Sequence, residues 1–403
     1  MQAITGHRIR RRYLALGVAA AALLAGCASN ATPSSGGGAT SSGPVLIGTS
    51  IALSGAIALP QIRDGYELAL ADANAKGGIQ VDGTKRKVEL KVLDNRTDTS
   101  TMLQQVRTLV VNDHVVALLG SCCQQNIDME AQADSLKVPL VMGALPVELL
   151  PAGNGYTWDA FQSLADGANG FYATAAKAGT NKKVLIVTDN DAQGTSTAQL
   201  WSQLGKAAGY DVVAVKAVPS GTTDFSNVIQ AGTSDKAQVL VAAMVPGDCF
   251  AMWKQMKALN YQPKIAIGLQ CAQTPGWSSL GSLGNGTLVQ MNWTQTAGLP
   301  DTAEVVAKYS SKYPNANDLG SVALGYAEAS ILLDAISRAG SAAPSAINKA
   351  LASTDMSTAL GSVKFTGNKS VTPTFLGQWE NGTISQVWPA KGGGPLSPLS
   401  GLG

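Results

Sequence analysis

Apolar runs and amphipathic stretches alternate along the chain from Val45 onward. Val45–Gly48 and Val115–Leu119 are continuous apolar runs, as in strands buried on both faces of a parallel sheet. Gln61–Ala75 instead carries its apolar residues on one helical face. The same rhythm predicts strands at 88–93, 140–142, 184–188, 212–215, 239–243 and 265–267, and helices at 101–112, 125–137, 167–178, 195–208 and 248–259. Such a series predicts an α/β fold of right-handed crossover units around parallel sheets.

The rhythm restarts near residues 157–162, which predicts two Rossmann-like lobes and not one sheet that holds every strand. Ligands of open parallel sheets bind outside the carboxyl ends of the strands. Two such lobes that face each other would enclose a ligand between them, and a hinge would close the cleft. The pattern therefore predicts a binding protein without naming what it binds.

The first 26 residues have the pattern of an export signal. Four arginines between Arg8 and Arg12 precede the apolar run Tyr13–Ala25, which is shorter than the ~20 residues of a membrane-spanning helix. The run ends in Leu24-Ala25-Gly26-Cys27, which resembles the lipobox of a bacterial lipoprotein signal peptide; an ordinary secretory signal with an incidental cysteine is the alternative. Residues 27–43 are rich in Ser, Gly, Thr and Ala, as flexible tethers are. We expect a protein exported by the Sec or the twin-arginine route and lipid-anchored through Cys27 to the outer face of the cell membrane, in the periplasm or at the cell surface.

The charge balance argues against a nucleic-acid partner. The chain has 29 basic and 27 acidic residues. Without the four arginines of the signal peptide, 25 basic residues stand against 27 acidic ones, a net charge of −2. A near-neutral chain lacks the basic footprint that nucleic-acid binding requires. The hydrophobic fraction of 45% is that of an ordinary globular protein.

Few residues remain for catalysis or metal binding after export. His114 is the one histidine beyond the signal peptide, and no two cysteines have the spacing of a zinc site. Cys123 could be a nucleophile at a helix N-terminus, but a five-residue strand of about 16 Å separates His114 from it. The sequence also lacks a nucleophile elbow, a P-loop and a His-Glu-x-x-His motif. We therefore expect no catalytic residue, no metal, no cofactor and no enzyme activity.

A set of short motifs carries a family resemblance. They are Ile47-Gly48, Leu53-Ser54-Gly55, Asp64–Ala69, Asp72–Ile79, Val92–Asn95, Leu118–Ser121, Val138–Val141 and Gly143–Pro146. The set resembles the leucine/isoleucine/valine-type periplasmic binding proteins, which are type I solute receptors of ABC importers, over about residues 44–389. The resemblance implies a lobe 1 of residues 44–160 plus 293–367 and a lobe 2 of residues 161–292 plus 368–389. Three strands, near 157–162, 290–293 and 366–371, would form the hinge. Residues 390–403, rich in Gly and Pro, are expected to form a disordered tail.

The resemblance also implies which positions face the ligand. The candidate ligand-binding residues are Ser54, Cys123, Gln124, Gln125, Ala144, Leu145, Gln193, Met244 and Gln270. Amino-acid-binding relatives have a Ser/Thr pair in the stretch that matches Cys122-Cys123-Gln124-Gln125 here, and often an acidic partner for the ammonium near the strand end where this chain has Gln270. These departures remove hydroxyl and carboxylate groups that would hold an α-amino acid. We expect a neutral, amide-like, aromatic or apolar ligand.

The remaining cysteines suggest a pairing. Cys249 opens a helix after one lobe 2 strand and Cys271 follows the neighbouring strand, which makes this pair a disulfide candidate in an oxidising compartment. Four cysteines allow three connectivities. Cys122 and Cys123 would then be two thiols that line the cleft, or a strained vicinal disulfide.

We interpret the chain as a lipid-anchored, monomeric receptor. It would bind a small-molecule solute by hinge closure and deliver it to the permease and ATPase subunits of an ABC importer. A sensor that binds a ligand and signals to a partner without transport is the alternative, because both functions need the same hinged cleft.

Overall fold

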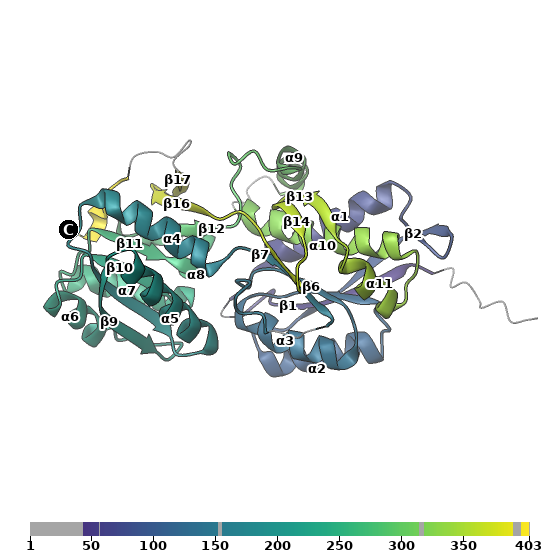
Figure 1. Ribbon diagram of the computed structural model, residues 1–403, viewed down its shortest axis with the longest axis horizontal. Coiled ribbons are helices and arrows are strands. Elements are labelled where there is room, and N and C mark those ends of the chain that lie inside the picture. Colours follow the sequence, from purple (N-terminus) through teal and green to yellow (C-terminus); the bar gives the residue numbers. More distant parts are fainter. Residues whose placement is uncertain (1–42, 56, 152–154, 314–317, 390–395, 403) are drawn as a thin grey trace, which may run out of the picture. The chain divides into compact units, whose positions relative to one another are not determined.

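The computed structural model describes residues 43–55, 57–151, 155–313, 318–389 and 396–402, apart from the side chains of Gln270 and Pro275. The predicted signal peptide, Cys27 and nearly all of the tether lie outside the described residues. Residues 42–403 form one unit, which contains two large, mainly parallel sheets (Figure 1).

The first sheet has six parallel strands in the order β15-β7-β6-β5-β1-β4. Its strands are β1 (Val45–Ile51), β4 (Val88–Asp94), β5 (Ala117–Leu119), β6 (Leu140–Met142), β7 (Thr157–Phe161) and β15 (Lys369–Val371). Its helices are α1 (Pro60–Ala75), α2 (Thr99–Val111), α3 (Cys123–Leu136), α9 (Thr302–Lys312), α10 (Leu319–Ala339) and α11 (Pro344–Leu351). Helices α2 and α3 cover one face and α1 and α10 the other (Figure 1).

The second sheet has seven strands in the order β17-β16-β12-β11-β10-β8-β9, and β16 runs antiparallel to both of its neighbours. Its strands are β8 (Lys183–Asp189), β9 (Asp211–Val218), β10 (Val239–Ala243), β11 (Ile265–Gly268), β12 (Leu288–Met291), β16 (Phe375–Glu380) and β17 (Thr383–Trp388). Its helices are α4 (Leu164–Ala175), η1 (Ala176–Ala178), α5 (Ala192–Ala207), α6 (Ser226–Ser234), α7 (Pro246–Ala258), α8 (Leu269–Ala272), η2 (Pro275–Gly284) and η3 (Ser400–Leu402). Each sheet is therefore an α/β layer with a hydrophobic core on both faces, and the predicted fold class is confirmed.

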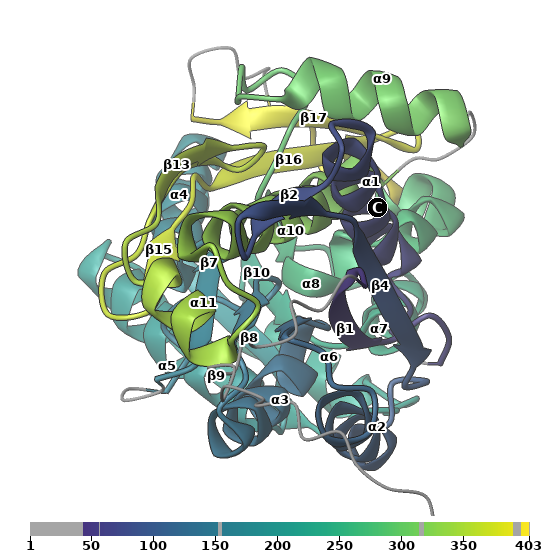
Figure 2. The same ribbon diagram turned by 90° about the vertical axis from the view of Figure 1, so that its right-hand side faces the viewer.

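Two short hairpins flank the first sheet. They are β2 (Ile79–Val81) with β3 (Thr84–Arg86), and β13 (Asp355–Thr358) with β14 (Gly361–Lys364). The second hairpin and α11 lie beside α10 (Figure 2).

Helices α1 and α10 approach each other through glycine. A Cβ on Gly65 would lie 2.3 Å from the carbonyl oxygen of Val322, and a Cβ on Gly325 would lie 2.0 Å from that of Ile62. Among the described residues, α10 is also the one helix long and apolar enough to cross a membrane. Its most apolar window is 67% buried in the protein, as expected of the core helix of a globular domain.

The structure differs from the sequence prediction at two chain segments. Lys369–Val371 pairs in parallel with β7 in the first sheet, whereas residues 368–389 were assigned as a block to lobe 2. The chain crosses to the second sheet only after this strand. Within the predicted disordered tail, residues 396–402 are ordered against the second sheet: Leu399 and Leu402 are each 2% exposed, and Gln262 Nε2 donates to the carbonyl of Leu399 (2.9 Å). Burial of these two leucines in an apolar cluster holds the segment in place.

Candidate functional site

A cavity of about 100 Å³ lies at the carboxyl ends of strands from both sheets. Cys123, Ala144 and Gln162 follow β5, β6 and β7, while Pro246 and Leu269 follow β10 and β11. The lining residues are Ile57, Leu59, Ile62, Cys123, Ala144, Pro146, Phe161, Gln162, Leu164, Gln193, Thr197, Pro246, Leu269, Gln273, Thr274, Gln290, Asn292, Asp318, Ser321 and Leu324. This is the edge at which open parallel sheets bind ligands, and we call this space the carboxyl-edge cavity.

A second cavity, of about 510 Å³, borders Lys177, Ile265 and Leu399. Ile265 is the first residue of β11, so this cavity lies at the amino end of that strand. It touches elements of the second sheet and the C-terminal segment alone. The carboxyl-edge cavity is the better candidate for a binding site because both sheets contribute to it.

Uncharged groups dominate the lining of the carboxyl-edge cavity. Five side chains are carboxamides, namely Gln162, Gln193, Gln273, Gln290 and Asn292. Three hydroxyl side chains join them, and apolar side chains form most of the remaining wall. No Lys, Arg or His occurs among the described lining residues. The cavity thus offers no side-chain cation to balance the charge of a bound carboxylate.

Asp318 is the one carboxylate among the described lining residues. It precedes α10, and its Oδ1 accepts a hydrogen bond from the backbone N–H of Ser321 (3.1 Å). Burial raises the pKa of Asp318, because removal from water disfavours the charged carboxylate. Asp318 therefore caps α10. Because its carboxyl is less readily ionised, it would bind a cationic ligand less strongly than an ordinary aspartate.

A second carboxylate, Glu148, occupies the start of α4 beside the cavity. Ser163 Oγ donates to Glu148 Oε1 (2.5 Å), and the backbone N–H groups of Leu164 and Ala165 donate to its two carboxylate oxygens (3.0 and 3.2 Å). A helix N-terminus attracts anions through its free N–H groups and its dipole. Because Glu148 already fills this position, the start of α4 is closed to an anionic ligand.

Two adjacent thiols begin α3. Both Cys122 and Cys123 are free, and Cys123 lines the cavity while Cys122 is buried behind it. A hydrogen bond between the two thiols raises the pKa of Cys122, with help from burial, and lowers the pKa of Cys123. The backbone N–H of Cys123 donates to the carbonyl of Ala144 (3.0 Å), so this amide is not available to a ligand. Cys123, the first residue of α3, has a positive φ of 54° and lines the cavity.

Three of the candidate ligand-binding residues line the cavity, namely Cys123, Ala144 and Gln193. The structure places Leu145 and Met244, each 0% exposed, in hydrophobic clusters, where apolar side chains gain more from packing than from facing a cavity. The side chain of Gln270 lies outside the described residues, although its backbone belongs to α8.

Three further candidates are held by bonds within the first sheet's loops and helices. Ser54 Oγ donates to Asp94 Oδ2 (2.7 Å) at an exposed turn. Gln125 is buried, accepts from Ser121 Oγ (2.9 Å) and donates to Asn95 Oδ1 (3.3 Å). Gln124 Nε2 donates to Asp128 Oδ1 (3.5 Å) on the same helix. None of the three is among the described residues that line the cavity.

The sequence analysis did not single out Gln162, Gln290 and Asn292, which lie where the chain crosses between the sheets. Gln290 Nε2 donates to the carbonyl of Ser163 (3.4 Å), so the crossings after β7 and at the end of β12 run side by side. Gly167 leaves room for Gln290, since a Cβ there would lie 2.1 Å from Gln290 Oε1. The signal that could have found these residues is an amide at the end of a buried strand within a predicted hinge.

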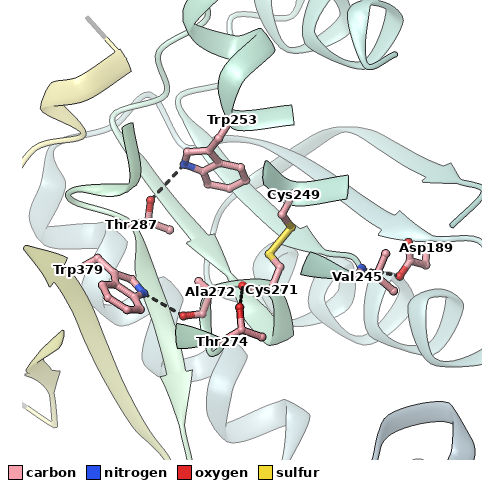
Figure 3. Close-up of a disulfide and its surroundings, with 9 residues drawn as sticks. All are labelled: Asp189, Val245, Cys249, Trp253, Cys271, Ala272, Thr274, Thr287 and Trp379. Atoms are coloured by element: carbon pink, nitrogen blue, oxygen red, sulfur yellow. Dashed lines mark hydrogen bonds between the residues drawn. A yellow bond between two sulfur atoms is a disulfide. The ribbon is translucent and has the colours of Figure 1, made fainter. Parts of the chain in front are cut away.

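A disulfide stabilises the opposite wall of the cavity. Cys249 on α7 and Cys271 on α8, the pair considered from the sequence, are joined in the structure with a Cα–Cα distance of 6.2 Å (Figure 3). Trp379 Nε1 donates to the carbonyl of Ala272 (2.9 Å), which fixes α8 further. At the start of α7, the backbone N–H of Val245 donates to Asp189 Oδ2 (2.8 Å), and burial raises the pKa of Asp189 to about 7.

Comparisons with known proteins agree with this architecture. A family model described as "Periplasmic binding protein" matches residues 44–383. A Leu/Ile/Val-binding protein homolog 7 from Brucella abortus (strain 2308) is 25% identical over 88% of this chain and 93% of its own length. A leucine binding protein from Thermotoga maritima has a TM-score of 0.75 at 20% identity, over 85% of this chain and 97% of that one. A solute binding protein from R. palustris, solved in complex with benzoate, has a TM-score of 0.73 at 16% identity, over 86% and 96%.

Proposed function

We propose, because this chain belongs to the periplasmic binding protein family, that it is the extracytoplasmic receptor of an ABC importer. Its fold is that of the type I members, with one α/β layer for each lobe. The receptor would capture a small solute in the carboxyl-edge cavity and deliver it to a membrane permease. The observation that carries the proposal is the cavity itself, which both sheets line at the carboxyl ends of their strands.

Closure of a hinge around the solute would be the receptor's working motion. The chain passes between the sheets after β7, after β12 and after β15, and the first two passages contribute Gln162 and Asn292 to the cavity. A few residues at the ends of elements can absorb the dihedral changes of such a closure. A ligand that contacts both lobes would favour the closed form by its extra contacts there.

The solute would be neutral, with an apolar or aromatic part. The described lining offers carboxamides and apolar walls such as Phe161 and Leu324, and no cation. Burial of an unbalanced charge is costly, and an uncharged ligand avoids it. Of the solved structures with this fold, one is described as a leucine binding protein and another was solved in complex with benzoate. The fold alone therefore does not determine the ligand.

Attachment to the membrane through a lipid on Cys27 belongs to the same proposal. The lipobox-like Leu24-Ala25-Gly26-Cys27 supports it, and residues 28–42 would then tether the receptor near its permease. A tethered receptor stays at a high local concentration beside the transporter.

Binding and uptake together test the proposed function. The full chain is screened by thermal shift against amino acids, amides, and aromatic and short-chain carboxylates, since a ligand of the folded state raises the melting temperature. A compound that binds is then supplied in labelled form to cells with and without the gene. We expect uptake to fall in the deletion strain and to return with the wild-type gene. Binding without any change in uptake would contradict the importer and favour the sensor.

A further inference from the structure

We propose that the carboxyl-edge cavity recognises a carboxamide group on an otherwise apolar solute, and that the side-chain amides of Gln162 and Asn292 read it. The inference rests on the proposed receptor function and names the chemical class of its ligand. The inference is based on two buried amide atoms that lack a hydrogen-bond partner in the described part of the protein.

Gln162 supplies an unused acceptor. It follows β7 directly and is 3% exposed, and its backbone carbonyl accepts from the N–H of Val147 (3.3 Å), which fixes the chain at this point. Its side-chain Oε1 is buried and has no hydrogen-bond partner among the described residues. A buried acceptor without a partner destabilises a fold, so a donor from the ligand would relieve it.

Asn292 supplies an unused donor. It follows β12 directly, and its Nδ2 is buried without a partner among the described residues. Its Oδ1 faces the first turn of α10: this atom and Asp318 Oδ1 each lie 3.8 Å from the position of a Cβ on Gly320. The buried amino group of the Asn292 side chain is the unpartnered donor.

The two groups belong to one wall. Both line the cavity, and the hydrogen bond from Gln290 Nε2 to the carbonyl of Ser163 joins their two chain crossings. Ser163 is the next residue after Gln162, and Gln290 lies two residues before Asn292. A ligand group that satisfies both must present a donor to Gln162 and an acceptor to Asn292.

A carboxamide meets this requirement without charge. Its N–H donates to Gln162 Oε1 and its carbonyl accepts from Asn292 Nδ2. A carboxylate has acceptors alone and would place a charged oxygen against the acceptor Gln162 Oε1. A zwitterionic amino acid has both kinds of group, but the described lining contains no cation for its carboxylate, and the one anion, Asp318, is a helix cap. The apolar wall, with Ile62, Phe161 and Leu324, suits a branched aliphatic or aromatic substituent.

Matched amide and acid probes test the proposal. Isovaleramide and benzamide, with isovalerate, benzoate and leucine, are titrated into the full chain at neutral pH. We expect an amide to bind at least about tenfold more tightly than its acid, as one hydrogen bond gained and one repulsion avoided would give. Equal or tighter binding of the acid, or of leucine, overturns the carboxamide assignment and leaves the receptor function standing. Failure of both amides to bind at millimolar concentration also overturns it, while the uptake experiment still decides the receptor function.

Substitutions assign the effect to the two side chains. Gln162→Met keeps the length of the side chain and removes the acceptor, so amide affinity should fall about tenfold while the melting temperature of the free protein stays or rises. Asn292→Leu should weaken amide binding similarly. Gln378→Met is the matched control, because Gln378 is 2% exposed but donates to the carbonyls of Gly286 and Ser397 (2.8 and 2.9 Å). This control should lower the melting temperature and leave affinity unchanged. Unchanged amide affinity in Gln162→Met, or an equal loss in the control, contradicts the proposal.

Discussion

Cys122 and Cys123 are neighbours in the chain but meet different surroundings. Cys122 is 3% exposed within the hydrophobic cluster beneath α1 and α10, and its pKa is raised. Cys123 is half-buried at the cavity, and its pKa is lowered by the hydrogen bond from its neighbour. The thiolate is the reactive form of cysteine. Burial and a raised pKa both lower the reactivity of Cys122, whereas partial exposure and a lowered pKa both increase the reactivity of Cys123.

We therefore predict that Cys123 alone reacts with a water-soluble alkylating reagent in the folded protein. Mass spectrometry of the peptide that contains both cysteines should show one modification, and Cys123→Ser should abolish it. A cavity ligand found by the thermal-shift screen should slow the modification. Two modifications under native conditions would contradict the difference in burial.

At the site, three candidate residues that follow strands of the predicted sheets line the cavity, namely Cys123, Ala144 and Gln193. Their role in ligand binding stays a prediction. Sequence reasoning could not separate Leu145 from Ala144, since both stand in one loop and the backbone alone decides which side chain faces the core. Gln162 and Asn292 lie within the predicted hinge, but the unpartnered atoms that distinguish them from other hinge residues are not visible in a sequence.

At the scale of elements, the contact between α1 and α10 organises the outer face of the first sheet. Gly65 and Gly325 let the two backbones approach, and Tyr66 donates from its hydroxyl to Glu328 Oε2 (2.5 Å) across the contact. Leu324 on α10 reaches the cavity from the same helix. Packing of this pair is therefore connected to the shape of the cavity wall.

Gly325→Ala should destabilise the protein strongly, because the new Cβ would lie 2.0 Å from the carbonyl oxygen of Ile62. Separation of the helices by such a clash typically costs about 1–3 kcal/mol or more. Gly320→Ala is the control on the same helix, since the nearest atoms to its Cβ lie 3.8 Å away and alanine favours helix. Urea unfolding of both variants measures the difference. Equal midpoints would contradict the tight contact.

The buried carboxyl of Glu328 should make stability depend on pH. Burial raises its pKa from 4.5 to about 8. Between these values the folded protein keeps a proton that the unfolded chain loses, so the free energy of unfolding falls as pH rises through this window. Glu328→Gln should flatten that fall, whereas Glu67→Gln, on a more exposed side chain of α1, should not. Urea midpoints at about pH 5 and pH 8 measure the slope. An unchanged slope in Glu328→Gln would assign the dependence to another group.

Some elements follow from the sequence pattern, whereas short strands and sparse apolar residues do not. Runs such as Val239–Ala243 are buried on both faces and were predicted from apolarity alone. The strand Lys369–Val371 has three residues, one of them buried, so no period marks it and its sheet is decided by pairing with β7. Leu399 and Leu402 are too sparse among Gly, Pro and Ser to predict an ordered segment, yet a neighbouring core buries them.

At the scale of the whole molecule, the proposed function assigns binding to the described residues and location to the N-terminal segment. The cores of both sheets and the cavity lie within residues 42–403. Residues 1–42 lie outside the described part of the chain, and their composition is that of a signal and a tether. Location and binding should therefore be separable by mutation.

Cys27→Ala tests this separation. If a lipid on Cys27 anchors the receptor, cells fed labelled palmitate should label the wild-type protein in the membrane fraction, and the variant should lose both the label and the membrane association. Cys123→Ala is the control, because its thiol lies in the folded part and should leave location unchanged. The melting temperature of the released variant should match that of the wild type, since the buried cores lie within the described residues. An unlabelled wild-type protein, or a variant that keeps the label, would contradict the lipid anchor; retention of an unlabelled variant in the membrane fraction would instead be assigned to the apolar run Tyr13–Ala25 as an uncleaved signal.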